Sequence, residues 1–188
     1  METKSHLLLA KYLLKQLPHF DSALYQKTFI WGCIEPDVNI FTYLKGSLAC
    51  QRLRGHNYNN TRKYTASLLE KLQGKRSWSL GEFFRLGKLM HYLSDAFTYP
   101  HNEHFPGTIW EHCAYEARLH EYFTTYLLSD QKKPLFKDLP GDMGEYIGEA
   151  HNQYLRISGD IKNDAKFITQ ATSRVMAALM HRLPMVCR

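Results

Sequence analysis

Apolar residues recur along this chain at intervals of three and four positions, the spacing that places them on one face of an α-helix. The first such run extends from about Lys4 to Leu17 and stops before Pro18, and the last carries an apolar stripe from Ile161 to Leu183. No segment alternates apolar and polar residues with the period of two that is typical of strands. The pattern therefore predicts an all-α fold of about seven helices.

Helix boundaries are marked by capping signals. Capping boxes, in which a Ser, Thr or Asp precedes a Glu by three positions, predict helix starts at Ser79, Thr108 and Asp142. Between the first run and the first of these boxes, the caps predict a helix from Asp21 or Ser22 to Ile30 and another from Asn60 or Thr61 to near Leu72. The segment 41–54 stays ambiguous.

Gly32 and Pro36 follow the second predicted helix, and both residue types commonly interrupt helices. We therefore expect a loop here, and we expect Asp37 to lie on it. A carboxylate held on a loop can reach across to a neighbouring site.

The composition suits one domain with a substantial core. The chain has 188 residues, of which 44% are hydrophobic, so we expect a single domain spanning residues 1–188. The formal net charge of +6 favours anionic partners such as phosphate esters, nucleic acid or an anionic membrane surface that the protein contacts peripherally.

The sequence shows no clear targeting signal and no disulfide pattern. The four cysteines are scattered, which argues against a thiolate zinc site or a disulfide framework. The N-terminal apolar run is broken by Lys11 and Lys15, which suits an amphipathic helix and not a signal peptide. No apolar run is long enough to predict a transmembrane helix. We therefore expect a cytoplasmic protein.

The candidate chemistry is concentrated between positions 91 and 116. His91 and Asp95 are four residues apart, as are His112 and Glu116, so each pair lies on one face of its helix, and His101 lies between the pairs. Because a short turn joins the two predicted helices, we expect them to pack antiparallel with these side chains facing each other.

A single His and Asp pair on a helix most often forms only a surface hydrogen bond. The larger set of histidines and carboxylates in this segment favours a metal site instead. Three imidazoles and two carboxylates beside apolar faces would be costly to bury without a cation. Imidazole and carboxylate ligands suit zinc, with iron or manganese as alternatives.

Four features outside this segment complete a pattern: His6, Trp31-Gly32, Pro36-Asp37 and His56. Together with the central histidines and carboxylates, they resemble the bacterial zinc-dependent phospholipase C family from His6 to Glu116. The resemblance implies an all-α bundle with three zinc ions at the bottom of a cleft, and hydrolysis of phospholipid phosphodiesters.

The resemblance also implies a ligand set. The first zinc would take Asp37, His56, His91 and Asp95; the second His101, His112 and Glu116; and the third His6, Asp95 and the N-terminal residue. A metal pair of this kind can hold an activated hydroxide for attack on phosphorus, with Asp37 as general base or as the residue that orients the water. The family begins with tryptophan where this sequence has Met1-Glu2, so we expect the third site to be weaker.

Two other functions stay open. The single-strand-specific zinc nucleases and nucleotide phosphatases share this scaffold, but they place aspartate where Glu116 stands and separate their last two ligand histidines more widely. A helical module with purely structural zinc is the second alternative, although structural sites favour thiolates. The headgroup and the physiological metal are not specified by the sequence.

Other histidines lie outside the family pattern. We expect His104 to lie in the connecting loop and His151 at the surface. His120 continues the face of His112 and Glu116 by one turn, which makes it a candidate hydrogen-bond partner for a ligand.

Overall fold

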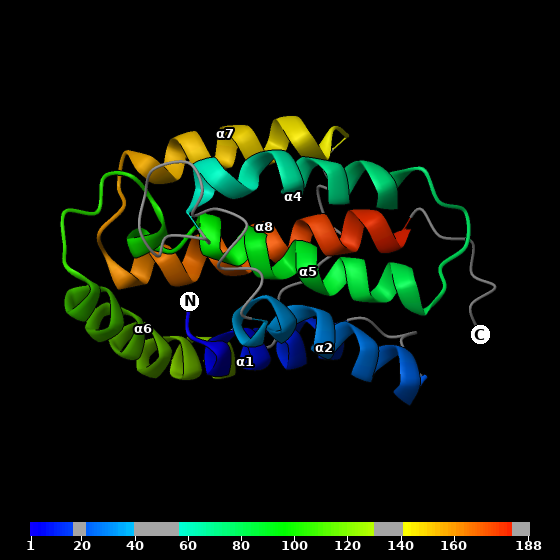
Figure 1. Ribbon diagram of the computed structural model, residues 1–188, viewed down its shortest axis with the longest axis horizontal. Helices are drawn as coiled ribbons and strands as arrows, with labels where there is room; N and C mark the ends of the chain where they lie inside the picture. The colour runs from blue at the N-terminus through cyan, green and yellow to red at the C-terminus, as the bar shows by residue number, and fades with distance from the viewer. Residues whose placement is uncertain (17–21, 40–56, 130–140, 182–188) are drawn as a thin grey trace.

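The computed structural model describes residues 1–16, 22–39, 57–129 and 141–181, and within them the protein is all-α (Figure 1). This confirms the fold class predicted from the sequence, with seven α-helices and one 3₁₀ helix in the described ranges. The elements are α1 (Thr3–Lys15), α2 (Ala23–Val38), α4 (Tyr58–Gln73), α5 (Leu80–Ala96), η2 (Tyr99–His101), α6 (Ile109–Ser129), α7 (Met143–Leu155) and α8 (Ile161–His181). The predicted ligand His56 and the ambiguous segment 41–54 lie outside these residues.

The capping boxes predicted at Ser79 and Thr108 are confirmed, whereas the predicted cap at Asn60 or Thr61 is wrong, because Asn57 caps α4. Ser22 precedes α2 but makes no side-chain capping bond. The Ser79 side chain accepts a hydrogen bond from the Gly81 amide, while Glu82 accepts one from the Ser79 amide, which closes the box at the start of α5. Thr108 and Glu111 exchange the same contacts before α6. These bonds satisfy amides that have no partner within the helix.

Helix α5 lies at the centre of the bundle. It packs against α2, α4 and α8, and its Leu86, Leu89 and Leu93 side chains are fully buried. Figure 1 shows α5 and α8 side by side, with α4 and α7 along one side of them and α1, α2 and α6 along the other. A helix enclosed in this way holds His91 and Asp95 away from water.

Two glycines allow α2 and α5 to approach closely. A Cβ atom on Gly32 would overlap the carbonyl oxygen of Phe84, and a Cβ on Gly87 would overlap that of Phe29. Gly32 is therefore required for the contact between the helices, and it does not end α2.

The loop predicted around Asp37 is wrong, because α2 continues through Pro36 to Val38. Proline in a helix interior costs about 3 kcal/mol, since its ring displaces the preceding turn and its nitrogen donates no hydrogen bond. Packing of α2 on α5 outweighs this local preference. Asp37 consequently lies in the last turn of a helix, which fixes its backbone.

The expected antiparallel packing of the two motif helices is also wrong. Helix α6 packs against α8 and α1, because the η2 turn and the residues after it carry the chain across the end of the bundle before α6 begins. The histidine and carboxylate side chains of α5 and α6 are therefore linked by contacts with η2 and the N-terminus. No helix in the described part of the chain is long and apolar enough to cross a membrane.

Candidate metal centre

The first cluster joins His6 on α1 to His91 and Asp95 on α5. The two carboxylate oxygens of Asp95 each lie 3.2 Å from one imidazole, Oδ1 from His6 Nε2 and Oδ2 from His91 Nε2. All three side chains are buried, and the two rings stack with centroids 3.9 Å apart. Their ligand atoms are close enough to hold one cation.

Hydrogen bonds on the far side of each ring orient these imidazoles. The Nδ1–H of His91 donates to the Cys33 carbonyl oxygen at 2.9 Å, since a carbonyl can only accept. Ser94 donates to the His91 carbonyl and therefore accepts from His6 Nδ1–H at 3.2 Å. Both Nε2 lone pairs are thereby directed into the cluster, the arrangement typical of metal-ligating histidines.

Asp37 lies at the edge of this cluster. Its Oδ1 is 3.7 Å from His91 Nε2, and its Oδ2 is 3.9 Å from His6 Nε2. The Thr3 hydroxyl donates to Oδ2 at 2.9 Å and fixes the carboxylate. The structure thus brings Asp37 to the predicted site, although from a helix end.

The second cluster joins His101 on η2 to His112 and Glu116 on α6. Glu116 Oε1 lies 2.8 Å from His101 Nε2 and 3.0 Å from His112 Nε2. His101 is 8% exposed and His112 remains half-buried, so this cluster is the more open of the two. Its three ligand atoms also converge closely enough for one cation.

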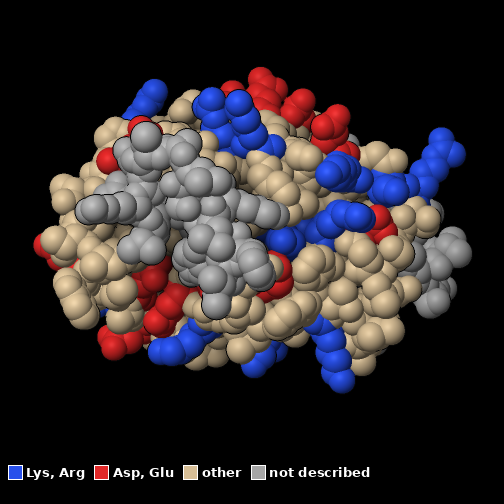
Figure 2. Space-filling model, in the orientation of Figure 1, with Lys and Arg blue, Asp and Glu red and all other residues tan. Residues whose placement is uncertain are grey.

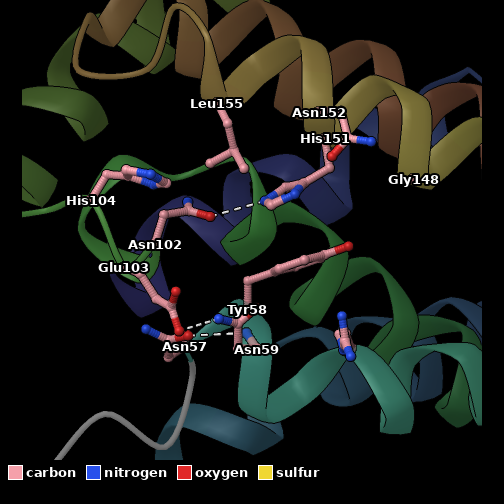
Figure 3. A pocket seen from close by; sticks show the side chains of 11 residues that line it. Asn57, Tyr58, Asn59, Asn102, Glu103, His104, Gly148, His151, Asn152 and Leu155 are labelled. Atoms are coloured by element: carbon pink, nitrogen blue, oxygen red, sulfur yellow. Dashed lines mark hydrogen bonds between the residues drawn. The ribbon is translucent and has the colours of Figure 1, made fainter.

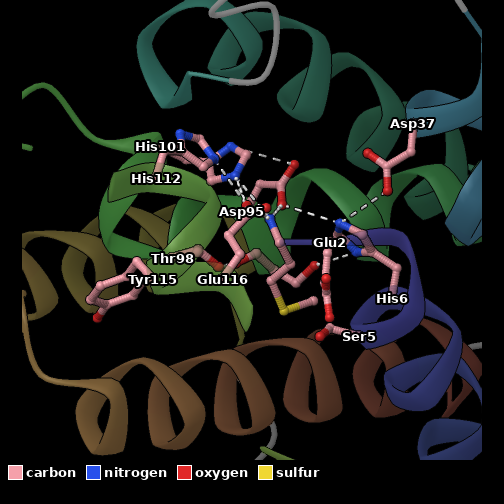
Figure 4. Close-up of polar contacts among 12 residues, drawn as sticks. Glu2, Ser5, His6, Asp37, Asp95, Thr98, His101, His112, Tyr115 and Glu116 are labelled. Carbon is pink, nitrogen blue, oxygen red and sulfur yellow. Dashed lines mark hydrogen bonds and ion pairs between the residues drawn. The ribbon is translucent and has the colours of Figure 1, made fainter. Parts of the chain in front are cut away.

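Asp95 and the N-terminal amine connect the clusters (Figure 4). The Met1 nitrogen lies 2.6 Å from Asp95 Oδ1, 2.8 Å from His101 Nε2 and 3.0 Å from Glu116 Oε1. Asp95 Oδ2 is also 3.8 Å from His101 Nδ1. Positive charge therefore sits between the two carboxylates, at the point where the family resemblance places a shared ligand and an amine ligand.

The electrostatics match this arrangement. Burial lowers the pKa of the Met1 amine, but Asp95 and Glu116 outweigh it and raise the pKa to about 11. Burial together with the neighbouring His91 lowers the pKa of His6 to about 4. Burial would raise the pKa of Asp95, yet the surrounding imidazoles and the amine hold it well below its usual range. His6 thus presents a neutral imidazole and Asp95 an ionised carboxylate, the states that bind metal. Burial also lowers the pKa of His91, but Asp95 and Asp37 outweigh it and raise this pKa.

The residues fit zinc on two observations. His6 Nε2 is buried and makes no well-aligned hydrogen bond, which would be costly unless another partner were to take its lone pair. The described donors are imidazole nitrogens, carboxylate oxygens and an amine, a set that suits zinc. The nearby Cys33 is buried, and burial raises the pKa of its thiol, which keeps it protonated.

A polar pocket of about 360 Å³ opens beside η2, between the N-terminus of α4 and α7 (Figure 3). His151 stacks on Tyr58 there and donates from Nε2 to Asn102 Oδ1 at 2.9 Å. Asn102 in turn donates to the carbonyls of Ala96 and Thr98, which fixes the chain after His101.

The prediction of a surface position for His151 is wrong, since this side chain is buried. Ile147, Ala150 and Tyr154, its helical neighbours at the core-facing spacing, were the signal that could have revealed this. The half-buried His120 bonds to the Ser5 hydroxyl at 2.9 Å, so it connects α6 to α1.

The helical bundle thus brings together two clusters of histidine and carboxylate side chains that could each hold a metal ion, which defines the class of the site as a candidate metal centre. Comparison with protein families finds that the model of the zinc-dependent phospholipase C family matches residues 5–161, and the chain belongs to this family. Comparisons with curated proteins and with solved structures gave no significant match. The family resemblance inferred from the sequence is therefore confirmed.

Proposed function

We propose that the protein is a phosphodiesterase that splits a phospholipid into diacylglycerol and a phosphorylated headgroup at the centre described above. The observation that carries this proposal is the position of Asp95, which belongs to the first triad and also lies within 4 Å of His101 in the second. A carboxylate placed in this way can serve two cations at once, and a metal pair can stabilise both the attacking and the leaving oxygen of a phosphodiester.

The proposed ligands are those that the family resemblance implies. His91, Asp95, Asp37 and His56 would hold the first zinc, and His101, His112 and Glu116 the second. His6, Asp95 and the Met1 amine would hold the third. Zinc, when bound, would supply positive charge that makes water more acidic and neutralises the phosphate as the bond breaks.

Asp37 is the proposed general base. Thr3 fixes its Oδ2, while its Oδ1 lies on the cluster side of α2, so a water between the cluster and Asp37 would be oriented for attack on phosphorus. Asp37 would accept the proton of that water. The bond from phosphorus to the glycerol oxygen then breaks, and solvent protonates the leaving diacylglycerol oxygen.

The test uses protein purified without chelators. We expect two to three equivalents of zinc per chain, and faster release of phosphorylated headgroup from a monomeric short-chain phosphatidylcholine than degradation of single-stranded DNA. Less than one equivalent of any transition metal would refute the catalytic centre. Faster degradation of DNA would assign the protein to the nuclease branch, and full zinc without either activity would indicate a structural role.

A further inference from the structure

A second buried carboxylate lies close behind the metal centre. Asp164 is in the first turn of α8 and has no exposed surface. It follows the last residue that the family model matches, and it is not among the proposed zinc ligands. A buried carboxylate is costly unless its oxygens are well bonded, so its partners indicate its role.

Three donors from three separate elements converge on this side chain. Asp164 Oδ2 accepts from the Tyr99 amide at 2.9 Å and from the Tyr115 hydroxyl at 2.9 Å. Oδ1 accepts from the Tyr154 hydroxyl at 2.8 Å. One carboxylate therefore ties η2, α6 and α7 to the start of α8.

Capping of α8 does not explain this arrangement. Asp160 already performs that task, because its Oδ1 accepts from the Lys162 amide and its carbonyl accepts from the Asp164 amide. The carboxylate of Asp164 is thus available for contacts outside its own helix.

Two of the three donors adjoin the second cluster. Tyr99 is the first residue of η2, the turn that ends with His101, and Tyr115 directly precedes Glu116 on α6. Because α6 packs against α8 and α1, bonds to α8 determine where α6 lies relative to η2. The same oxygen of Asp164 holds both elements, so it fixes their separation.

We propose that Asp164 is a positioning residue for the second triad, which holds η2 and α6 in the register at which His101 and Glu116 converge on one cation. This inference rests on the proposed function, because the cation is the second zinc. Asp164 contacts neither metal nor substrate and acts only through Tyr99 and Tyr115.

The two tyrosines provide a matched pair of variants. Tyr115→Phe and Tyr154→Phe each remove one hydroxyl from the same carboxylate, but Tyr154 lies on α7, which carries no member of either triad. The probe is zinc alone, with dissociation constants measured by competition with a chromophoric chelator. The thermal midpoint of the metal-free proteins measures the purely structural effect of each change.

We expect Tyr115→Phe to weaken the binding of one zinc by about 10- to 100-fold, as is usual when a group that orients a ligand is lost. Tyr154→Phe should lower the metal-free midpoint to a similar extent and keep the wild-type zinc affinities. Asp164→Asn should weaken the same zinc as Tyr115→Phe.

If the wild-type protein binds its zinc normally, two results would still refute the proposed positioning role of Asp164. One is wild-type affinity in Tyr115→Phe, and the other is equal loss of zinc affinity in both phenylalanine variants. A wild-type protein that binds no zinc would instead refute the proposed function and this inference together.

Discussion

The amine nitrogen of Met1 lies 2.6 Å from Asp95 Oδ1, although 94 positions separate the two residues in the chain. The amine is completely buried, and its neighbours are carboxylates and an imidazole from the two clusters. The Met1 amine thus lies between the two clusters, and both partners in this contact can be tested directly.

Asp95→Asn should release the metals together. The substitution keeps the size of the side chain and its place on α5 but removes the charge that offsets two dications. We expect the first and third zinc ions to be lost together. Hydrolysis should fall by more than about 100-fold, which is the upper range for loss of a group that only supports a ligand. Metal analysis, hydrolysis and circular dichroism measure the change.

Glu116→Gln and His104→Gln serve as comparisons for Asp95→Asn. Glu116 contacts the imidazoles of the second cluster and the Met1 amine, so its loss should leave the first zinc bound. His104 is exposed and belongs to neither cluster, and its variant should behave as wild type. If Asp95→Asn kept full zinc and activity, or if His104→Gln were equally damaging, the ligand assignment would be wrong.

If the wild-type protein holds three zinc ions, extension of the N-terminus by two residues, Gly-Ser, should remove one of them and leave the other two. An amide nitrogen at Met1 cannot bear the charge or offer the lone pair of the present amine, and the buried position leaves no space for added residues. The readouts are zinc stoichiometry and the intact mass that verifies the extension. The same two residues added at the C-terminus form the control, and full zinc in the N-terminal variant would contradict a ligand role for the amine.

Gly32→Ala should destabilise the protein by roughly 1–3 kcal/mol, the usual cost of overpacking a tight contact. The added methyl group would overlap the Phe84 carbonyl and push α2 away from α5. Urea unfolding measures the change. Gly148→Ala is the matched control on α7, where a Cβ meets no neighbour within 4 Å, and it should raise stability by up to about 1 kcal/mol. Equal effects of the two substitutions would refute the close-contact explanation.

His151 should make the protein less stable in acid. Burial lowers the pKa of this imidazole to about 4 from its usual value of 6.5. Between these values the unfolded chain binds a proton that the folded protein does not, so the free energy of unfolding falls as the pH falls from about 6.5 to 4. The shift corresponds to roughly 3 kcal/mol.

His151→Gln should therefore flatten the pH dependence of unfolding in this window, as measured by urea denaturation at several pH values. His181→Gln changes an exposed histidine at the end of α8 and is the control. An unchanged slope in His151→Gln would show that the imidazole is not the group responsible.

Much of the helical framework could be predicted from the sequence because its signals are local. The Ser79 and Thr108 capping boxes specify helix starts through contacts within four residues, and the structure shows both. The pairing of His91 with Asp95 follows from helical geometry alone. Such features can be predicted without knowing how the rest of the chain folds.

The errors arise where distant packing decides the outcome. Pro36 predicts a break by local preference, but contact with α5 keeps α2 helical to Val38. The meeting of His6 with Asp95 and of the Asp164 carboxylate with Tyr115 depends on how helices far apart in the chain pack. The family resemblance supplied the first of these contacts, and no signal in the sequence supplied the second.

The close crossing of α2 and α5 also constrains the orientation of the His91 imidazole. Most core contacts are between side chains, which can change rotamer to absorb a substitution, whereas Gly32 and Gly87 bring backbone against backbone with nothing to rotate. The residue after Gly32 is Cys33, whose carbonyl selects the tautomer of His91. A shift of α2 at this crossing would therefore also move the Cys33 carbonyl that orients His91, so a substitution at either glycine should change the position of this imidazole as well as the stability of the protein.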